Sequence, residues 1–183
     1  MKKIDLSTYN KGDYSPGKSK TVLLLWYVFN VIFFMNPLFT FVKIKIAILR
    51  IFGAKLGKNI NVKPSVNIKY PWHLSIGNNV WMGENVWIDN LCKVTIGDNV
   101  CISQGALILT GNHDYSRTEF NLVVKEIEIS EGAWIGARSI VAPGASLASH
   151  SVLTAGSILS SSTEPYSIYK GNPAVKIKNR EIK

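Results

Sequence analysis

A six-residue period of aliphatic residues runs through most of this 183-residue chain. From Leu56 onward these residues fall into trios spaced by six, and two residues are added between the early trios, at Leu74-Ser75 and Val94-Thr95. An α-helix would repeat apolar residues at three and four positions, so a helix is a poor alternative for this part of the chain. The positions are Leu56, Val62, Ile68, Ile76, Met82, Ile88, Ile96, Ile102, Ile108, Ile129, Ile135, Val141, Leu147, Leu153 and Leu159.

A second set of residues keeps the same period, because a small or β-branched residue lies four positions after most of these aliphatics. We predict a coil of very short parallel strands in which both sets point inward and three units complete one triangular turn. Stacked coils would be spaced like strands in a sheet, about 4.8 Å apart. The predicted fold class is therefore all-β, a parallel β-helix. The second set is Val80, Val86, Val100, Ala106, Ala133, Ser139, Ala145, Ser151 and Ser157.

One interruption breaks the period, since the step from Ile108 to Ile129 spans 21 residues. We predict an inserted loop over residues 114–125 that leaves the coil immediately after His113. A long loop on a rigid scaffold usually carries function. The chain is thus expected to comprise an N-terminal extension (1–52), a β-helix domain (53–163) with this loop, and a basic C-terminal tail segment (164–183).

The N-terminal extension is apolar, basic and predicted to be helical. A membrane-spanning helix needs about 20 predominantly apolar residues, and Asn30, Asn36 and Pro37 interrupt the run from Val22 to Val42. Three alternatives remain at this point. Residues 22–52 pack against the domain or a neighbouring subunit, contact a membrane peripherally as a helix of mixed cations and aliphatics would, or insert into it.

The net charge of +9 indicates an anionic partner of some kind. Lys and Arg gather at the two ends of the chain and no DNA or RNA recognition motif is found, so we expect no nucleic-acid partner. Cys92 and Cys101 form no CxxC pair, which argues against a zinc site or a disulfide framework. Two thiols favour a cytoplasmic location, and membrane contact would place the protein at the inner face.

His113 lies at the base of the predicted loop, within Thr110-Gly-Asn-His-Asp-Tyr115. Acyl transfer from a thioester to a hydroxyl needs a base near the working pH, and imidazole has an unperturbed pKa of about 6.5. No nucleophilic Cys or Ser is required if the acceptor hydroxyl attacks directly. The alternative is a loop-stem histidine that merely hydrogen-bonds its neighbours.

The pattern Gly111-x-His113-Asp-Tyr115 is followed after the loop by Gly132-Ala-Trp134-Ile-Gly136-Ala137. Together with Tyr70-Pro-Trp72 and Gly171-Asn-Pro173-Ala, it resembles the hexapeptide-repeat O-acetyltransferases of bacterial polysaccharide biosynthesis, most closely the colanic-acid type. The resemblance implies a left-handed β-helix, a homotrimer, acetyl-CoA as co-substrate without a metal, and His113 as general base.

The same resemblance implies that acetyl-CoA binds in the cleft between adjacent β-helices. Small residues suit a wall against which an extended pantetheine lies, although the repeat's own steric demand also explains them. The cationic C-terminus would hold the phosphates or form a solvated tail, and Ser160-Ser161 stands where the family often has Thr-Lys. The expected binding residues are Trp134, Gly136, Ala137, Ala155, Gly156, Ser160, Lys176 and Lys178.

A saccharide hydroxyl in capsule or exopolysaccharide biosynthesis is the expected acceptor, bound by Asn85, Asp89, Asn90 and Tyr115. A free sugar or a xenobiotic is the alternative acceptor. A non-catalytic structural β-helix is a further alternative. A carbonic-anhydrase-like zinc site is disfavoured because the three histidines fall on different coils. Trp81 and Trp87, in consecutive units, are expected to pack side by side on one face.

Overall fold

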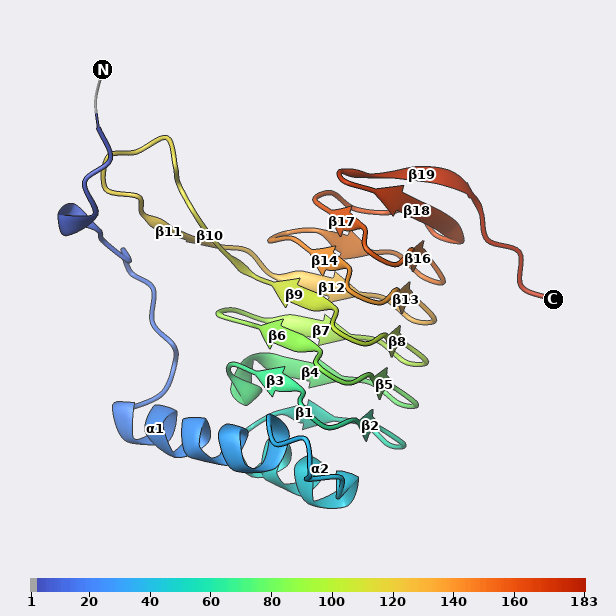
Figure 1. Cartoon of the computed structure of the whole chain (residues 1–183), viewed down its shortest axis with the longest axis horizontal. Coiled ribbons are helices and arrows are strands. Elements are labelled where there is room, and N and C mark those ends of the chain that lie inside the picture. The colour runs from blue at the N-terminus through green and yellow to red at the C-terminus, as the bar shows by residue number, and fades with distance from the viewer. Residues whose placement is uncertain (1–2) are drawn as a thin grey trace.

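The fold is a stack of triangular coils. A computed structural model describes residues 3–183 of the chain. Helices lie across the N-terminal end of the stack and a hairpin lies on the other end (Figure 1). The first face is a parallel sheet of β1 (Lys55–Leu56), β4 (Leu74–Ile76), β7 (Val94–Ile96), β12 (Ile127–Ile129) and β15 (Ser146–Leu147).

The other two faces repeat this arrangement, and each strand pairs with the strand one coil away. The second sheet contains β2 (Asn61–Val62), β5 (Trp81–Met82), β8 (Cys101–Ile102), β13 (Trp134–Ile135), β16 (Val152–Leu153), β18 (Ser167–Gly171) and β19 (Ala174–Asn179). The third sheet contains β3 (Asn67–Ile68), β6 (Trp87–Asp89), β9 (Leu107–Leu109), β14 (Ile140–Val141) and β17 (Ile158–Leu159).

The period-six aliphatics form three columns inside the stack. In the first sheet Ile76, Ile96, Ile129 and Leu147 are register partners from coil to coil. Corresponding columns fill the other two sheets, and every member except the half-buried Leu56 is buried. The nine small or β-branched residues are buried as well. The predicted parallel β-helix is confirmed.

Asparagines hold one corner of the early coils. Asn59, Asn79 and Asn99 adopt φ of 55°, 57° and 57°, a left-handed conformation that asparagine tolerates better than most residues. Their side-chain amides are linked from coil to coil, with Nδ2 to Oδ1 distances of 3.0 and 3.1 Å. The corner is therefore stabilised both by local conformation and by a hydrogen-bonded ladder.

Trp81 and Trp87 do not lie side by side, so that prediction was wrong. Trp81 is on β5 in the second sheet and Trp87 is on β6 in the third. A step of six is one side of the triangle, so consecutive units belong to different faces. The neighbours of Trp81 are Asn61 and Cys101, which lie one coil away.

The N-terminal helices close the first coil, and this outcome matches the packing alternative. The helices are α1 (Lys20–Phe29), continued by the π-helical η2 (Asn30–Phe34), and α2 (Val42–Ile51). The buried Trp26 donates from Nε1 to the carbonyl of Ile68 at 2.9 Å. In the part of the chain that the structure describes, no helix is long and apolar enough to cross a membrane. Two short 3-10 helices, η1 (Leu6–Thr8) and η3 (Pro71–His73), complete the set.

The inserted segment begins earlier than predicted. It is an antiparallel hairpin of β10 (Gly111–His113) and β11 (Leu122–Val124), which projects from the side of the stack (Figure 1). We refer to residues 111–124 as the arm. His113 therefore lies within the arm, paired with Leu122, rather than at the point where the chain leaves the coil.

The C-terminal segment is a hairpin rather than a solvated tail. Strand β18 continues the second sheet in parallel with β16, and β19 turns back antiparallel to it. Tyr169, on β18, is buried against the last coil. The basic residues of β19 are therefore held at fixed positions on the molecule.

Candidate active site

The imidazole of His113 has a defined tautomer. Its Nδ1 lies 3.0 Å from the carbonyl oxygen of Phe120, across the turn of the arm. A carbonyl only accepts hydrogen bonds, so Nδ1 carries a proton, and in the neutral imidazole the lone pair is on Nε2. The ring is thus prepared to accept a proton at Nε2.

Aromatic rings hold this imidazole in place. The Phe120 ring stacks on it, with centroids 4.4 Å apart and planes 8° from parallel, and Tyr9 lies at 5.9 Å. The N-terminal segment reaches the arm through a backbone bond of 3.0 Å from the Asp5 amide to the Thr118 carbonyl. Sequence reasoning missed Phe120 and Tyr9, because a backbone carbonyl has no residue signature and Tyr9 is remote in the chain.

Asp114 does not orient the imidazole of His113. Its Oδ1 accepts hydrogen bonds from the side chain and backbone of Ser116, and Oδ2 lies 3.4 Å from Nε of Arg117. The bonds from Ser116 lower the pKa of this exposed carboxyl, and Arg117 contributes less. Asp114 therefore stabilises the turn of the arm.

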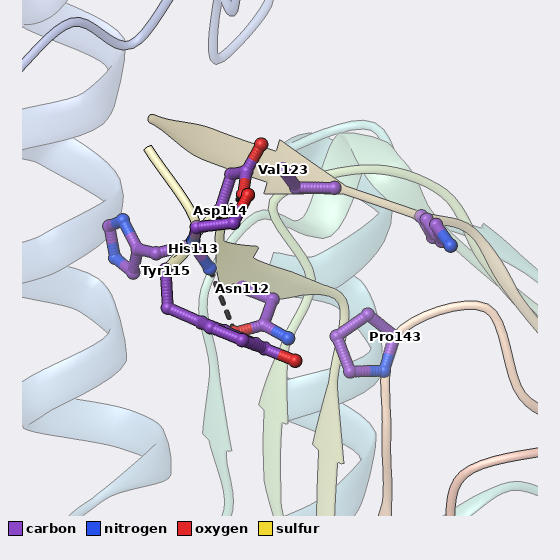
Figure 2. A pocket seen from close by; sticks show the side chains of 8 residues that line it. Asn112, His113, Asp114, Tyr115, Val123 and Pro143 are labelled. Carbon is purple, nitrogen blue, oxygen red and sulfur yellow. Dashed lines mark hydrogen bonds between the residues drawn. The ribbon is translucent and has the colours of Figure 1, made fainter. Parts of the chain in front are cut away.

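A cavity of about 310 Å³ opens at the base of the arm. Figure 2 shows the phenol of Tyr115 extending toward Pro143, whereas the imidazole of His113 points away from Pro143. Tyr115 is largely exposed. The cavity is lined by Asn112, His113, Asp114, Tyr115, Ser116, Val123, Lys125 and Pro143.

The other predicted acceptor residues have different surroundings. Asn90 is fully buried, and its amide group donates to the Tyr70 carbonyl at 2.7 Å and accepts from the Tyr70 amide at 2.9 Å. Its role is therefore structural, and the predicted contact with an acceptor is not supported. Asp89 pairs with Lys69 at 3.1 Å, and Asn85 is an exposed corner residue with φ 58°.

The predicted coenzyme wall lies on the second sheet. The indole of Trp134 is half-exposed and donates from Nε1 to the Ser103 hydroxyl at 2.9 Å. Trp134, Ala155 and Lys178 line one cavity of about 560 Å³, together with Arg180. Arg180 is positioned by hydrogen bonds from its guanidinium to the carbonyls of Gly132 and His150.

The small residues of this wall are explained by stacking of the coils. A Cβ on Gly136 would lie 2.4 Å from the backbone nitrogen of Ala155, so only glycine fits there. Gly156 has φ 70°, and its amide donates to the Ala137 carbonyl at 2.9 Å. The two glycines are therefore required by the fold, and Ala155 is exposed at the surface.

Two of the predicted coenzyme-binding residues are placed elsewhere. Lys176 pairs with Glu164, with Nζ 2.7 Å from Oε2. Ser160 follows β17 on the third sheet, so it does not share a face with Trp134. Lys178 is the predicted cation that lines the cavity with Trp134.

The two parts of the predicted site lie on different sides of one chain. The arm leaves after β9 of the third sheet and returns into β12 of the first, whereas Trp134 and Ala155 belong to the second-sheet side. Figure 1 shows the arm projecting on the side opposite β13 and β16. Among residues 3–183, no group of three or more His, Cys, Asp or Glu side chains is arranged to hold a metal ion.

Known proteins are similar to this chain in sequence and in fold. The chain is 36% identical over 178 residues to WcaF of Escherichia coli, named as a colanic acid biosynthesis acetyltransferase, covering 96% of this chain and 97% of WcaF. It is 33% identical over 132 residues to the galactoside O-acetyltransferase of E. coli, covering 70% of this chain and 64% of that protein. A comparison with models of protein families finds no match.

A solved hexapeptide-repeat acetyltransferase from Vibrio cholerae, in complex with acetyl coenzyme A, superposes with a TM-score of 0.81. It is 19% identical and is matched over 96% of this chain and 97% of its own, a likeness that concerns the fold. The sequence match to WcaF extends over nearly the whole of both proteins. On these grounds the chain belongs to the hexapeptide-repeat acetyltransferases.

Proposed function

We propose that this acetyltransferase moves an acetyl group from acetyl-CoA to a saccharide hydroxyl, with His113 as general base. The observation that carries the proposal is the tautomer of His113, since the bond from Nδ1 to the Phe120 carbonyl leaves Nε2 as a base. Two relatives support the chemistry by their names, one for colanic acid biosynthesis and one for O-acetylation of galactosides.

In this mechanism Nε2 of His113 accepts the proton of the acceptor hydroxyl as its oxygen attacks the thioester carbonyl. The C–O bond of the new ester forms and the C–S bond breaks. The imidazolium then returns the proton to the departing sulfur, so the products are an acetyl ester and free CoA. Throughout the cycle the Phe120 carbonyl keeps the ring oriented and stabilises its charged form.

The site needs more than one copy of the chain. His113 and the wall of Trp134 lie on different sides of the coil stack, so they face one another only when the arm of one subunit reaches the wall of the next. A cyclic homotrimer repeats this heterologous contact around a closed ring. In that arrangement Trp134 and Ala155 would lie along the pantetheine, with Lys178 toward the phosphates.

The acceptor is proposed to be a saccharide used in capsule or exopolysaccharide biosynthesis. Tyr115 and the cavity at the base of the arm offer an aromatic ring beside polar groups, a combination that suits a sugar. A free sugar or a xenobiotic would require the same base and a different acceptor surface. The two free thiols, Cys92 and Cys101, favour a cytoplasmic site for the reaction.

The test is release of CoA from acetyl-CoA in the presence of candidate saccharides, measured with a thiol reagent. Replacing His113 by Ala should lower the rate by roughly 10²–10⁴-fold while acetyl-CoA binding persists. Calorimetric titration with acetyl-CoA separates the two effects. Full activity in the H113A variant would refute the mechanism, and a folded protein that fails to bind acetyl-CoA would refute the function.

A further inference from the structure

The outer face of the N-terminal helices is apolar and exposed. Leu24 on α1 is 65% exposed, Leu38 in the turn between helices is 86% exposed, and Ile51 at the end of α2 is 80% exposed. The inner face of the same helices is buried on the first coil through Trp26, Phe34 and other side chains. We call this outer surface the cap face; it also includes Leu25, Val28, Ile32, Phe41 and Ile44.

Large exposed apolar surfaces mark interaction sites, because each side chain left in water forgoes the free energy of burial. The helices that carry the cap face lie across the end of the coil stack opposite the C-terminal hairpin (Figure 1). It is also separate from the arm and from the wall of Trp134. Its partner is therefore not explained by acetyl transfer.

The charge around the cap face is of one sign. The sequence contains no Asp or Glu between Asp13 and Glu84. Lys20, Lys43 and Arg50 are exposed at the ends of α1 and α2. Two copies of this face brought together would place these cations against each other, whereas an anionic surface would neutralise them.

We propose that the cap face binds the surface of a bilayer that carries anionic phospholipids. An interfacial helix combines an apolar face at the acyl boundary with Lys and Arg at the level of the headgroups. The continuous helix Lys20–Phe34 supplies the apolar face, and the turn that follows it adds the exposed Leu38 and Phe41. Contact is peripheral, because the helices lie along the end of the coil stack.

Membrane attachment would determine where the enzyme is found, and the proposal does not depend on which reaction the enzyme catalyses. It would hold the active site near a membrane, where an acceptor attached to a lipid would be found. Attachment of a cyclic oligomer would be stronger than that of a single chain, since symmetry turns every cap face the same way along the axis.

Flotation of the full-length protein with vesicles tests the proposal. Vesicles of phosphatidylcholine and phosphatidylglycerol in equal parts should carry the protein upward, and vesicles of phosphatidylcholine alone should carry much less. Binding should fall as salt is raised. The Lys43→Glu variant should bind the anionic vesicles at least about tenfold more weakly, whereas the matched Lys183→Glu variant should bind like the wild type.

The apolar contribution has its own pair of variants. Leu38→Asp should abolish or strongly reduce vesicle binding, and Ile182→Asp, at an exposed position outside the cap face, should leave it unchanged. Circular dichroism and acetyl-CoA titration verify that each variant is folded. If the wild-type protein does not bind anionic vesicles, the proposal is refuted. So does a Leu38→Asp protein that still floats, or one whose only defect is loss of the oligomer seen by light scattering.

Discussion

At some positions the stacking of adjacent coils allows only one type of residue. Gly136 lies so close to the backbone of the next coil that a Cβ would meet three backbone atoms within 2.7 Å. This close approach, and not the backbone conformation of Gly136, is what requires glycine there. A glycine with such neighbours is dictated by packing. It is also one of the small residues of the wall that we propose for acetyl-CoA, so a larger side chain there would change both the coil spacing and the shape of the wall.

Replacing Gly136 by Ala should destabilise the protein by roughly 1–3 kcal/mol, the usual range for overpacking a well-packed interior. A Gly to Ala change at a tolerant site would instead stabilise slightly, by restricting the unfolded chain. Thermal unfolding of the two proteins measures the effect. An unchanged or raised melting temperature would mean that neighbouring coils separate more easily than their hydrogen bonds indicate.

At the same scale, sequence reasoning singled out His113 as the candidate base but did not predict the groups that surround it. His113 was proposed from its type, from the broken period and from the family resemblance, whereas its hydrogen-bond partner is the backbone carbonyl of Phe120, which has no sequence signal. Asn90 was predicted to contact an acceptor and is instead buried against Tyr70. The sequence cannot distinguish an asparagine that hydrogen-bonds the backbone from one that binds a sugar. The burial of the side chain in the structure decides between the two roles.

At the scale of elements, the helix α2 carries a lysine on the wrong side for a simple amphipathic pattern. Lys43 is exposed, but Lys45 is fully buried and donates from Nζ to the carbonyl of Lys63 at 3.0 Å. Its ammonium also lies 5.9 Å from the centroid of the Phe34 ring. Desolvation lowers the pKa of Lys45 to about 8.

This pKa gives the helix a pH-dependent stability. The unfolded chain holds the lysine proton up to pH 10.5 and the folded chain releases it near pH 8, so the free energy of unfolding rises between these values. At about 1.36 kcal/mol per pKa unit, the gain is up to roughly 3 kcal/mol. The cost of the buried charge is fully present below pH 8.

The variant Lys45→Met should lack this gain. Its melting temperature relative to the wild type should therefore be highest near neutral pH and should decline as the pH is raised through 8 toward 10. Thermal unfolding over this range, with Lys43→Met as the exposed control, measures the trend. Parallel pH curves for Lys45→Met and the wild type would mean that water or backbone groups fully solvate the buried ammonium.

The sequence predicted the strands correctly only where the chain follows the six-residue period. Each aliphatic of the period-six set occupies its expected column, because a repeated step of six places successive trios in register. The tryptophans of β5 and β6 were misplaced because one step turns a corner and a full turn is needed to return to the same face. The start of the arm and the C-terminal hairpin fall where the period is absent, so hydrogen bonding alone sets their bounds.

For the whole molecule, the division of the site between two sides of the chain makes a specific demand on assembly. One subunit would supply His113 and the next would supply the wall around Ala155. Mutations in the two halves should then complement each other within a mixed oligomer. If each site were contained in one chain, two inactive variants would not restore activity to each other.

The variants His113→Ala and Ala155→Trp should each be nearly inactive, the second because the indole fills the cavity beside Trp134. When both chains are co-expressed in equal amounts, about one quarter of the sites in a random cyclic oligomer should pair an intact arm with an intact wall. Acetyl transfer by the co-purified oligomer, compared with mixtures assembled separately, measures this recovery. No recovery in the mixed oligomer would place both halves of the site within one subunit.

The C-terminal hairpin has a consequence for how the molecule ends. A stack of parallel strands presents open edges to which another copy could add, at the same spacing that separates its own coils. Strand β19 runs antiparallel on the outside of the second sheet and carries exposed Lys176 and Lys178, while α1 and α2 cover the opposite end. Without residues 167–183, β16 would become the open edge of the second sheet, so we expect a chain truncated in this way to associate end to end more readily than the full chain.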